Sequence, residues 1–141
     1  GLHAARALRR SAAEVIVVDR QNHHLFQPLL YQVATAALSP GNIASPIRKI
    51  LGRQRNCEIV MAEVTDVDVE SKRVTIGGEP YVYDYLVVAA GCRTNYFGND
   101  EWAAHAPGLK TIDEAVAIRA RFLLRSSRPS SSAMTTRDEP R

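Results

Sequence analysis

The chain has 141 residues, of which 45% are hydrophobic, and its 18 basic and 15 acidic residues give a formal net charge of +3 at pH 7. This length supports roughly one domain, and no apolar run reaches the roughly 20 residues that a membrane-spanning helix needs. The basic residues are spread over separate predicted elements without a dense basic and aromatic patch, which argues against a nucleic-acid partner. Near the start, basic residues follow a short apolar stretch instead of preceding it, which is not the order of a signal peptide.

The first half of the chain predicts two helices, a strand and a long loop. Residues 2–10 carry leucine and alanine at helical spacing, as an amphipathic helix requires. Residues 14–19 form an apolar run that is typical of a buried strand. Residues 20–42 predict a loop, and its length and apolar content favour a functional segment that covers a ligand. Residues 43–51, which precede a glycine, predict the second helix.

The second half predicts a small antiparallel sheet between longer elements. Residues 57–62 form an apolar strand, and residues 64–76 alternate apolar and polar side chains up to the Gly77-Gly78 turn, as in a β-meander. Residues 81–91 predict another buried strand that runs into a glycine. A final helix is expected over residues 112–124.

The order of these elements indicates an α/β fold. Strands alternating with helices, and an antiparallel meander inserted before the last strand, predict a doubly wound, Rossmann-like sheet. We therefore expect residues 1–124 to form a partial dinucleotide-binding domain. Residues 125–141 are rich in serine and poor in apolar side chains, so we expect them to form a disordered tail.

Two positions carry the dinucleotide-binding prediction. Asp19 ends the strand over residues 14–19, where a carboxylate can accept hydrogen bonds from a ribose diol; the alternative is a surface acid that ends a strand. Gly1 precedes the first helix and matches the last glycine of a G-x-G-x-x-G turn, whose helix binds the pyrophosphate. We expect the first strand and the first two glycines of that motif to lie upstream of residue 1.

Other reactive side chains form no recognisable motif. Cys57 and Cys92 are far apart and fit neither a metal site nor a redox pair, so we expect both to be small buried apolar residues. His23 and His24 are adjacent, so their side chains diverge, and no other ligands lie at metal-binding spacing. No residue is predicted to be catalytic, and no metal is predicted.

Several stretches resemble the type II NADH dehydrogenases, single-subunit flavoproteins that pass electrons from NADH through FAD to quinone. The similar stretches are residues 19–35, 83–91, 95–98 and 101–110, and the resemblance extends from Gly1 to about Leu124. It stops where the family continues into a second nucleotide domain. Our hypothesis is that residues 126–141 are non-native sequence, for instance from a shifted reading frame, and sequencing of the encoding locus tests it.

The resemblance implies that this is the FAD-binding portion of such an enzyme. It implies that Asp19 holds the adenosine ribose of FAD, with Arg20 beside the adenosine half, and that Gln27 contacts the cofactor. Val64 matches a position whose backbone meets the adenine.

A glycine turn completes the implied site. Ala90 and Gly91 match the Ala-Thr-Gly turn by which these flavoproteins approach the cofactor, although Ala90 stands where threonine is usual. The substitution removes a hydroxyl and keeps a small side chain, so close backbone approach remains possible.

The resemblance also implies partners and location, with two alternatives. The full enzyme uses NADH and quinone and lies in the cytoplasm or on the cytoplasmic face of the inner membrane, with peripheral membrane contact through regions outside this chain. Because the NADH domain is absent here, we expect this chain alone to be inactive. One alternative is a sulfide:quinone or ferredoxin-type reductase, although residues 20–42 lack the cysteine that the former needs. The other is an α/β remnant that binds no ligand.

Overall fold

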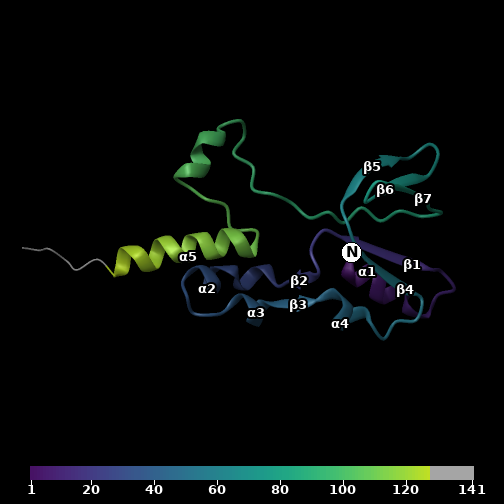
Figure 1. Ribbon diagram of the computed structural model, residues 1–141, viewed down its shortest axis with the longest axis horizontal. Coiled ribbons are helices and arrows are strands. Elements are labelled where there is room, and N and C mark those ends of the chain that lie inside the picture. Colours follow the sequence, from purple (N-terminus) through teal and green to yellow (C-terminus); the bar gives the residue numbers. More distant parts are fainter. Residues whose placement is uncertain (128–141) are drawn as a thin grey trace, which may run out of the picture.

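The computed structural model describes residues 1–127. Its helices and 3-10 turns are α1 (Leu2–Ala7), η1 (Leu8–Arg10), η2 (Gln27–Leu29), α2 (Leu30–Ala34), α3 (Pro40–Ile43), α4 (Ile47–Leu51), η3 (Asp100–Ala104) and α5 (Ile112–Ser126). Its strands are β1 (Val15–Asp19), β2 (His23–Leu25), β3 (Ala44–Pro46), β4 (Cys57–Met61), β5 (Val64–Asp68), β6 (Arg73–Ile76) and β7 (Glu79–Val82). Figure 1 shows the β5–β7 sheet above the β1–β4 pair, and α5 lying along α2.

Strands β1 and β4 form the parallel pair on which the α/β prediction depends. Their register runs from Val15 opposite Cys57 to Asp19 opposite Met61, so both strands end at the same edge. Parallel strands need a crossover connection, and the helices beside the pair bury their apolar faces against it. The buried side chains of this cluster are Ala5, Ile47 and Leu51, with Leu2, Val15, Val17, Ile50, Cys57 and Ile59 packed around them. The predicted α/β architecture is confirmed.

The segment predicted as one loop, residues 20–42, contains four short elements instead, namely β2, η2, α2 and α3. Leu30 and Val33 of α2 are 1% and 0% exposed and pack with Ala115 of α5. Packing against α5 therefore accounts for the apolar content of this segment. The prediction that these residues form a loop without secondary structure was wrong. Helix α2 has only five residues, too few for a helical period to show in the sequence.

The helix predicted over residues 43–51 is divided between β3 and α4, and it begins only at Ile47. Pro46 explains this difference. A proline disfavours helical geometry in the residue before it, so Ser45 is extended and lies opposite His24 in the β2–β3 pair. The glycine after the helix was a correct signal, since α4 ends at Leu51.

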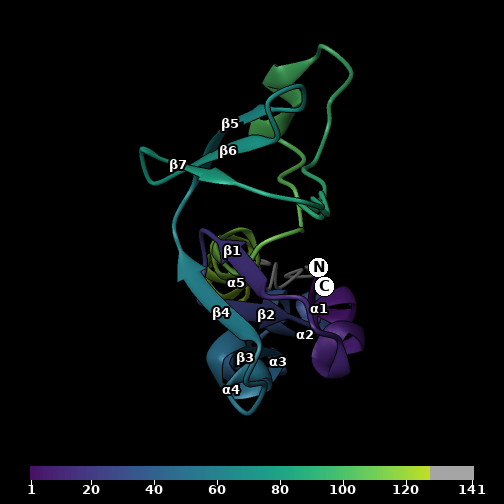
Figure 2. The ribbon, with the colours of Figure 1, turned by 90° about the vertical axis from the view of Figure 1, so that its right-hand side faces the viewer.

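Strands β5, β6 and β7 form the predicted antiparallel meander, which stands apart from the β1–β4 pair in Figure 2. The Asp68 carboxylate holds its first turn by accepting a hydrogen bond from the Ser71 hydroxyl at 2.6 Å and from the backbone N–H groups of Ser71 and Glu70 at 3.0 Å. The Ser71 hydroxyl, followed by the backbone donors, lowers the pKa of Asp68 below its usual range. The hydrogen bonds to the ionised Asp68 carboxylate therefore stabilise the fold above the ordinary carboxyl pKa, and this stabilisation is lost as pH falls through the lowered pKa.

The prediction of a buried strand over residues 81–91 was wrong, since β7 ends at Val82 and is exposed along its length, with Val82 77% exposed. Tyr85 is 94% exposed and Val88 is 78% exposed. Among the described residues, positions 85–95 make no backbone–backbone hydrogen bond. In the described part of the chain β1 pairs only with β4, so no strand provides hydrogen-bonding partners for the backbone of this β-prone segment.

Helix α5 confirms the prediction over residues 112–124 and continues to Ser126. A capping box starts it. The Thr111 hydroxyl accepts from the Glu114 backbone N–H at 3.2 Å, and the Glu114 carboxylate accepts from the Thr111 backbone N–H at 3.0 Å. Residues 125 and 126 are helical, so the prediction that a disordered tail begins at residue 125 was wrong there, and residues 128–141 lie outside the described residues. Across residues 1–127, no helix combines the length and the apolar character that crossing a membrane requires.

Replacement of Thr111 by alanine is expected to lower the free energy of unfolding by about 0.5–2 kcal/mol, because the first turn of α5 loses its side-chain cap. Thr111→Ser is the matched control, since it keeps the hydroxyl. Urea denaturation monitored by circular dichroism measures both variants. Equal stability of the alanine and serine variants would show that the cap contributes nothing.

Candidate functional site

The carboxyl edge of the β1–β4 pair carries the first candidate site residue. The Asp19 carbonyl accepts a hydrogen bond from the Ala62 N–H at 3.1 Å, which extends the pairing beyond β4. Oδ1 of Asp19 accepts from the Gln21 backbone N–H at 2.8 Å, which fixes the carboxylate at the strand end. Oδ2 has no hydrogen-bond donor among the described residues, and the residue is exposed. Asp19 can therefore accept hydrogen bonds from a ligand while its own position is held.

The next residues along both strands meet at the same edge. Arg20 lies 3.8 Å from the Glu63 carboxylate in an ion pair whose side chains are 56% and 65% exposed. An exposed pair of this kind contributes at most about 1 kcal/mol, so a ligand can replace either partner. Val64 follows Glu63 directly, opens β5 and is 42% exposed. The structure thus brings Asp19, Arg20 and Val64 to one edge and adds Glu63, which the sequence analysis missed although it follows the second parallel strand.

A second group of predicted residues surrounds the start of α1. A Cβ added to Gly1 would lie 3.3 Å from the Cβ of Ala89, so the start of α1 and the segment before Gly91 are in close contact. Gly91 has a φ of +74°, a conformation that side chains disfavour, and an added Cβ there would meet nothing within 4 Å. Gly1, Ala90 and Gly91 therefore belong to one neighbourhood, in which Ala89 is the contact that sequence reasoning did not single out.

Gln27 is not joined to either group. It begins η2, one residue after the β2 strand ends at Leu25, and its Nε2 donates to the Lys110 backbone carbonyl at 3.3 Å. This bond connects η2 to the residues that precede α5. Among the described residues, no hydrogen bond or ion pair links Gln27 to Asp19, Val64 or Gly91.

All seven candidate residues are exposed, and none of them lines either of two cavities in the described structure. The first cavity, of about 440 Å³, lies beside the end of η1. The second, of about 480 Å³, lies at the amino ends of β1 and β4, the opposite end of the pair from Asp19.

The remaining reactive side chains form no metal site and no cysteine pair among the described residues. Within residues 1–127, no three His, Cys, Asp or Glu side chains lie close enough together to hold a metal ion. Cys57 is half-buried, and burial raises the pKa of its thiol. Cys92 is exposed, so the prediction that it is buried was wrong. It follows residues 85–91, which make no backbone–backbone hydrogen bond within the described part of the chain.

The amino-acid sequence is similar to those of known oxidoreductases. The family model described as pyridine nucleotide-disulphide oxidoreductase matches residues 1–126. The type II NADH:quinone oxidoreductase NdhA of Mycobacterium tuberculosis is 47% identical over 87% of this chain and 27% of its own length. A probable mitochondrial NADH-ubiquinone oxidoreductase of Schizosaccharomyces pombe is 36% identical over 84% of this chain and 23% of its own length. The chain thus spans about a quarter of the curated relatives that it matches.

Solved structures agree with the fold. The sulfide:quinone oxidoreductase of Aquifex aeolicus aligns over 92% of this chain and 30% of its own, with a TM-score of 0.80 and 21% identity, which supports the fold alone. NDH2 of Plasmodium falciparum, solved in complex with NADH, aligns over 82% of this chain and 26% of its own, with a TM-score of 0.70 and 30% identity. The parallel pair and the inserted meander are therefore arranged as in larger oxidoreductases of Rossmann-like fold.

Proposed function

Because the chain belongs to the pyridine nucleotide-disulphide oxidoreductase family, we propose that it is the FAD-binding part of a NADH:quinone oxidoreductase. The similarity to type II NADH:quinone oxidoreductases over 87% of the chain supports this proposal. In the full enzyme, FAD would supply the redox chemistry, accepting a hydride from NADH and passing electrons to a quinone. We place that enzyme in the cytoplasm or at the cytoplasmic face of the inner membrane.

The observation that carries the proposal is the Asp19 carboxylate, fixed at the carboxyl end of a parallel strand pair with one oxygen free of donors from the described residues. A carboxylate that accepts hydrogen bonds in this position fits the hydroxyl groups of the ribose diol of FAD. Arg20 would lie beside the adenosine half of FAD, and the backbone at Val64 would meet the adenine. The weak Arg20–Glu63 pair leaves the guanidinium available for this role.

The other candidate residues would serve the rest of the cofactor. Gly1 keeps the start of α1 close to Ala89, and Gly91 lets the backbone turn without a side chain in the way. Gln27, held through Lys110, would contact the cofactor from η2. All of these groups bind and orient FAD, and none is assigned a proton transfer or a covalent step.

Binding of free cofactor to the purified 141-residue chain tests the proposal. Flavin absorbance that travels with folded protein, and quenching of FAD fluorescence on titration, are the expected results. FMN is the matched control ligand, because it lacks the adenosine that Asp19, Arg20 and Val64 would hold. We expect FMN to bind at least about tenfold more weakly, the loss of roughly one hydrogen-bonded charged contact. A folded, colourless chain that binds neither flavin would overturn the proposal and favour an α/β remnant without a ligand.

The isolated chain is expected to show no NADH:quinone oxidoreductase turnover. We propose that residues 1–124 are a partial FAD domain, and the relatives that it matches are about four times longer than the aligned portion. NADH oxidation at 340 nm, with a soluble quinone and added FAD, is the measurement. Turnover above that of free FAD would contradict the assignment of the NADH site to a region outside this chain.

The structural likeness to a sulfide:quinone oxidoreductase raises that enzyme as a second candidate. A sulfide:quinone oxidoreductase is expected to need reactive cysteines near the flavin, and residues 20–42 contain none. Cys57 is half-buried at the start of β4, the end of the pair opposite to Asp19. Cys92 is exposed and directly follows Gly91, but it is a single cysteine. The chain is 47% identical to a type II NADH:quinone oxidoreductase and 21% identical to the sulfide:quinone oxidoreductase, so we favour NADH as the electron donor.

A further inference from the structure

Arginines that are scattered in the sequence gather around one cavity in the fold. Arg6 on α1, Arg9 and Arg10 on η1, and Arg53 just after α4 all line the open cavity of about 440 Å³. The other side chains that line it are neutral, among them buried Leu51 and Gln54, and no carboxylate lines it. The cavity therefore carries four positive charges and no negative side chain.

The backbone that carries these arginines is held in place by two neutral amides. Gln54 is 7% exposed, and its Nε2 donates to the Ala5 carbonyl at 2.9 Å, which joins the end of α4 to α1. Nδ2 of Asn56 donates to the Leu8 and Ala13 carbonyls at 3.0 and 2.8 Å, which fixes η1 and the residues after it. The four arginines are thus presented from a fixed frame, although the guanidinium groups themselves reach into solvent.

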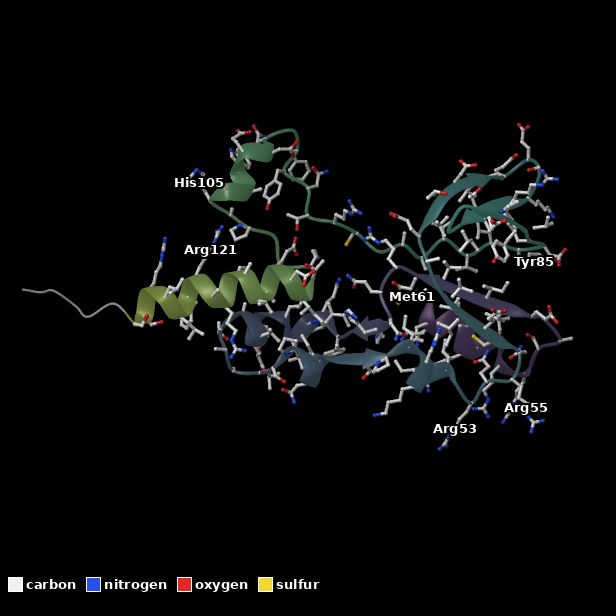
Figure 3. The ribbon with its side chains drawn as sticks, in the orientation of Figure 1. Arg53, Arg55, Met61, Tyr85, His105 and Arg121 are labelled. Carbon is white, nitrogen blue, oxygen red and sulfur yellow. The ribbon has the colours of Figure 1, made fainter. Side chains whose placement is uncertain are left out.

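The positive charge of the four arginines is only slightly compensated by other groups of the described chain. A guanidinium stays protonated at any physiological pH, and none of the four forms an ion pair with another described residue. The carbonyl ends of α1–η1 and of α4 offer about half an elementary negative charge each, which leaves most of the positive charge unbalanced. In Figure 3, Arg53 and Arg55 project from the same part of the molecule, but Arg55 lines the other cavity.

We infer that this cavity binds an anion with two or more phosphate groups. Guanidinium forks match phosphate oxygens two at a time, which makes arginine well suited to phosphate recognition. A volume of about 440 Å³ lies in the range of small-ligand sites, roughly 300–1,000 Å³. The cavity lies at the far end of the first helical segment from Gly1, so the inference does not depend on the proposed flavin site.

Two sources could supply this chemistry, a free polyphosphate or the headgroups of an anionic lipid surface, and two binding assays distinguish them. The first is calorimetric titration of the 141-residue chain with inorganic pyrophosphate. The second is co-sedimentation with vesicles of phosphatidylglycerol and phosphatidylcholine, compared with vesicles of phosphatidylcholine alone. Binding of pyrophosphate identifies a free phosphate ligand, and binding restricted to the anionic vesicles identifies a lipid surface.

A pair of double variants separates a site from general charge attraction. Arg9→Gln with Arg53→Gln removes two charges that line the cavity, and Arg48→Gln with Arg55→Gln removes two neighbouring charges that do not. We expect the first variant to weaken binding at least tenfold and the second to change it less than twofold, with circular dichroism spectra unchanged. Equal losses in both variants, or no binding to pyrophosphate and to anionic vesicles, would overturn the inference.

Discussion

Replacement of Leu30 by alanine is expected to lower the free energy of unfolding by about 2–5 kcal/mol, the usual cost of a large-to-small change in a packed core. Leu30 is 1% exposed and lies in the cluster with Val33, Ile43 and Ala115 that joins α2 to α5. This cluster holds α5 against the segment of residues 20–42, assisted by the Arg119 guanidinium, which donates to the Leu38 carbonyl at 3.3 Å. Loss of the leucine side chain therefore weakens the attachment of α5 as well as the core.

The matched control is Leu124→Ala on α5, where the side chain is 69% exposed. That change should alter stability by less than about 0.5 kcal/mol, because an exposed side chain leaves no cavity behind. Urea denaturation gives the two free energies of unfolding, and limited proteolysis reports whether α5 detaches. If the two variants lose the same stability, the α2–α5 cluster is not the core that its burial indicates.

The parallel strand pair and the meander could be predicted because each has a strong local signal. The apolar run that becomes β1 is bounded by polar residues, and β4 repeats that pattern after a helix. The alternation in residues 64–76 and the Gly77-Gly78 turn indicated an antiparallel arrangement, which β5, β6 and β7 have. In both regions the hydrophobic period and the turn residues indicate the same structure, and such agreement allows the structure to be predicted from the sequence.

Short elements and missing neighbours explain the failures. Helices of four or five residues, such as α2 and α3, are stabilised by tertiary contacts and leave no period to detect. The segment over residues 83–91 has the composition of a strand, but a strand is defined by its partner. No described strand pairs with it, so Val87 and Val88 are 62% and 78% exposed.

The candidate site was predictable in its parts and not in its arrangement. The edge that joins Asp19 to Val64 follows from the rule that parallel strands end together, which the sequence order alone implies. The contact between Gly1 and Ala89 links residues far apart in the chain, and no local sequence pattern predicts it. The same applies to Arg6 and Arg53, since only the packing of α1 on α4 brings them to one cavity.

Replacement of Asp19 by alanine is expected to weaken FAD binding by about ten- to a hundredfold. Hydrogen bonds to a charged group contribute about 1.5–3 kcal/mol, and each 1.4 kcal/mol corresponds to a factor of about ten in Kd. FMN binding should change little, because the Asp19 carboxylate is proposed to hold the adenosine half. Fluorescence titration of both flavins with the variant and the unchanged chain is the measurement.

Asp68→Ala is the matched control, because Asp68 makes the same local contact at a different place. Oδ1 of Asp19 accepts from the backbone N–H two residues later at 2.8 Å, and Oδ1 of Asp68 does so at 3.0 Å. Both variants therefore lose an exposed carboxylate and its turn, but only Asp19 lies at the end of the parallel pair. A loss of FAD affinity confined to Asp19→Ala assigns the effect to the site, whereas equal losses would show that turn stability, and not ribose recognition, governs cofactor binding.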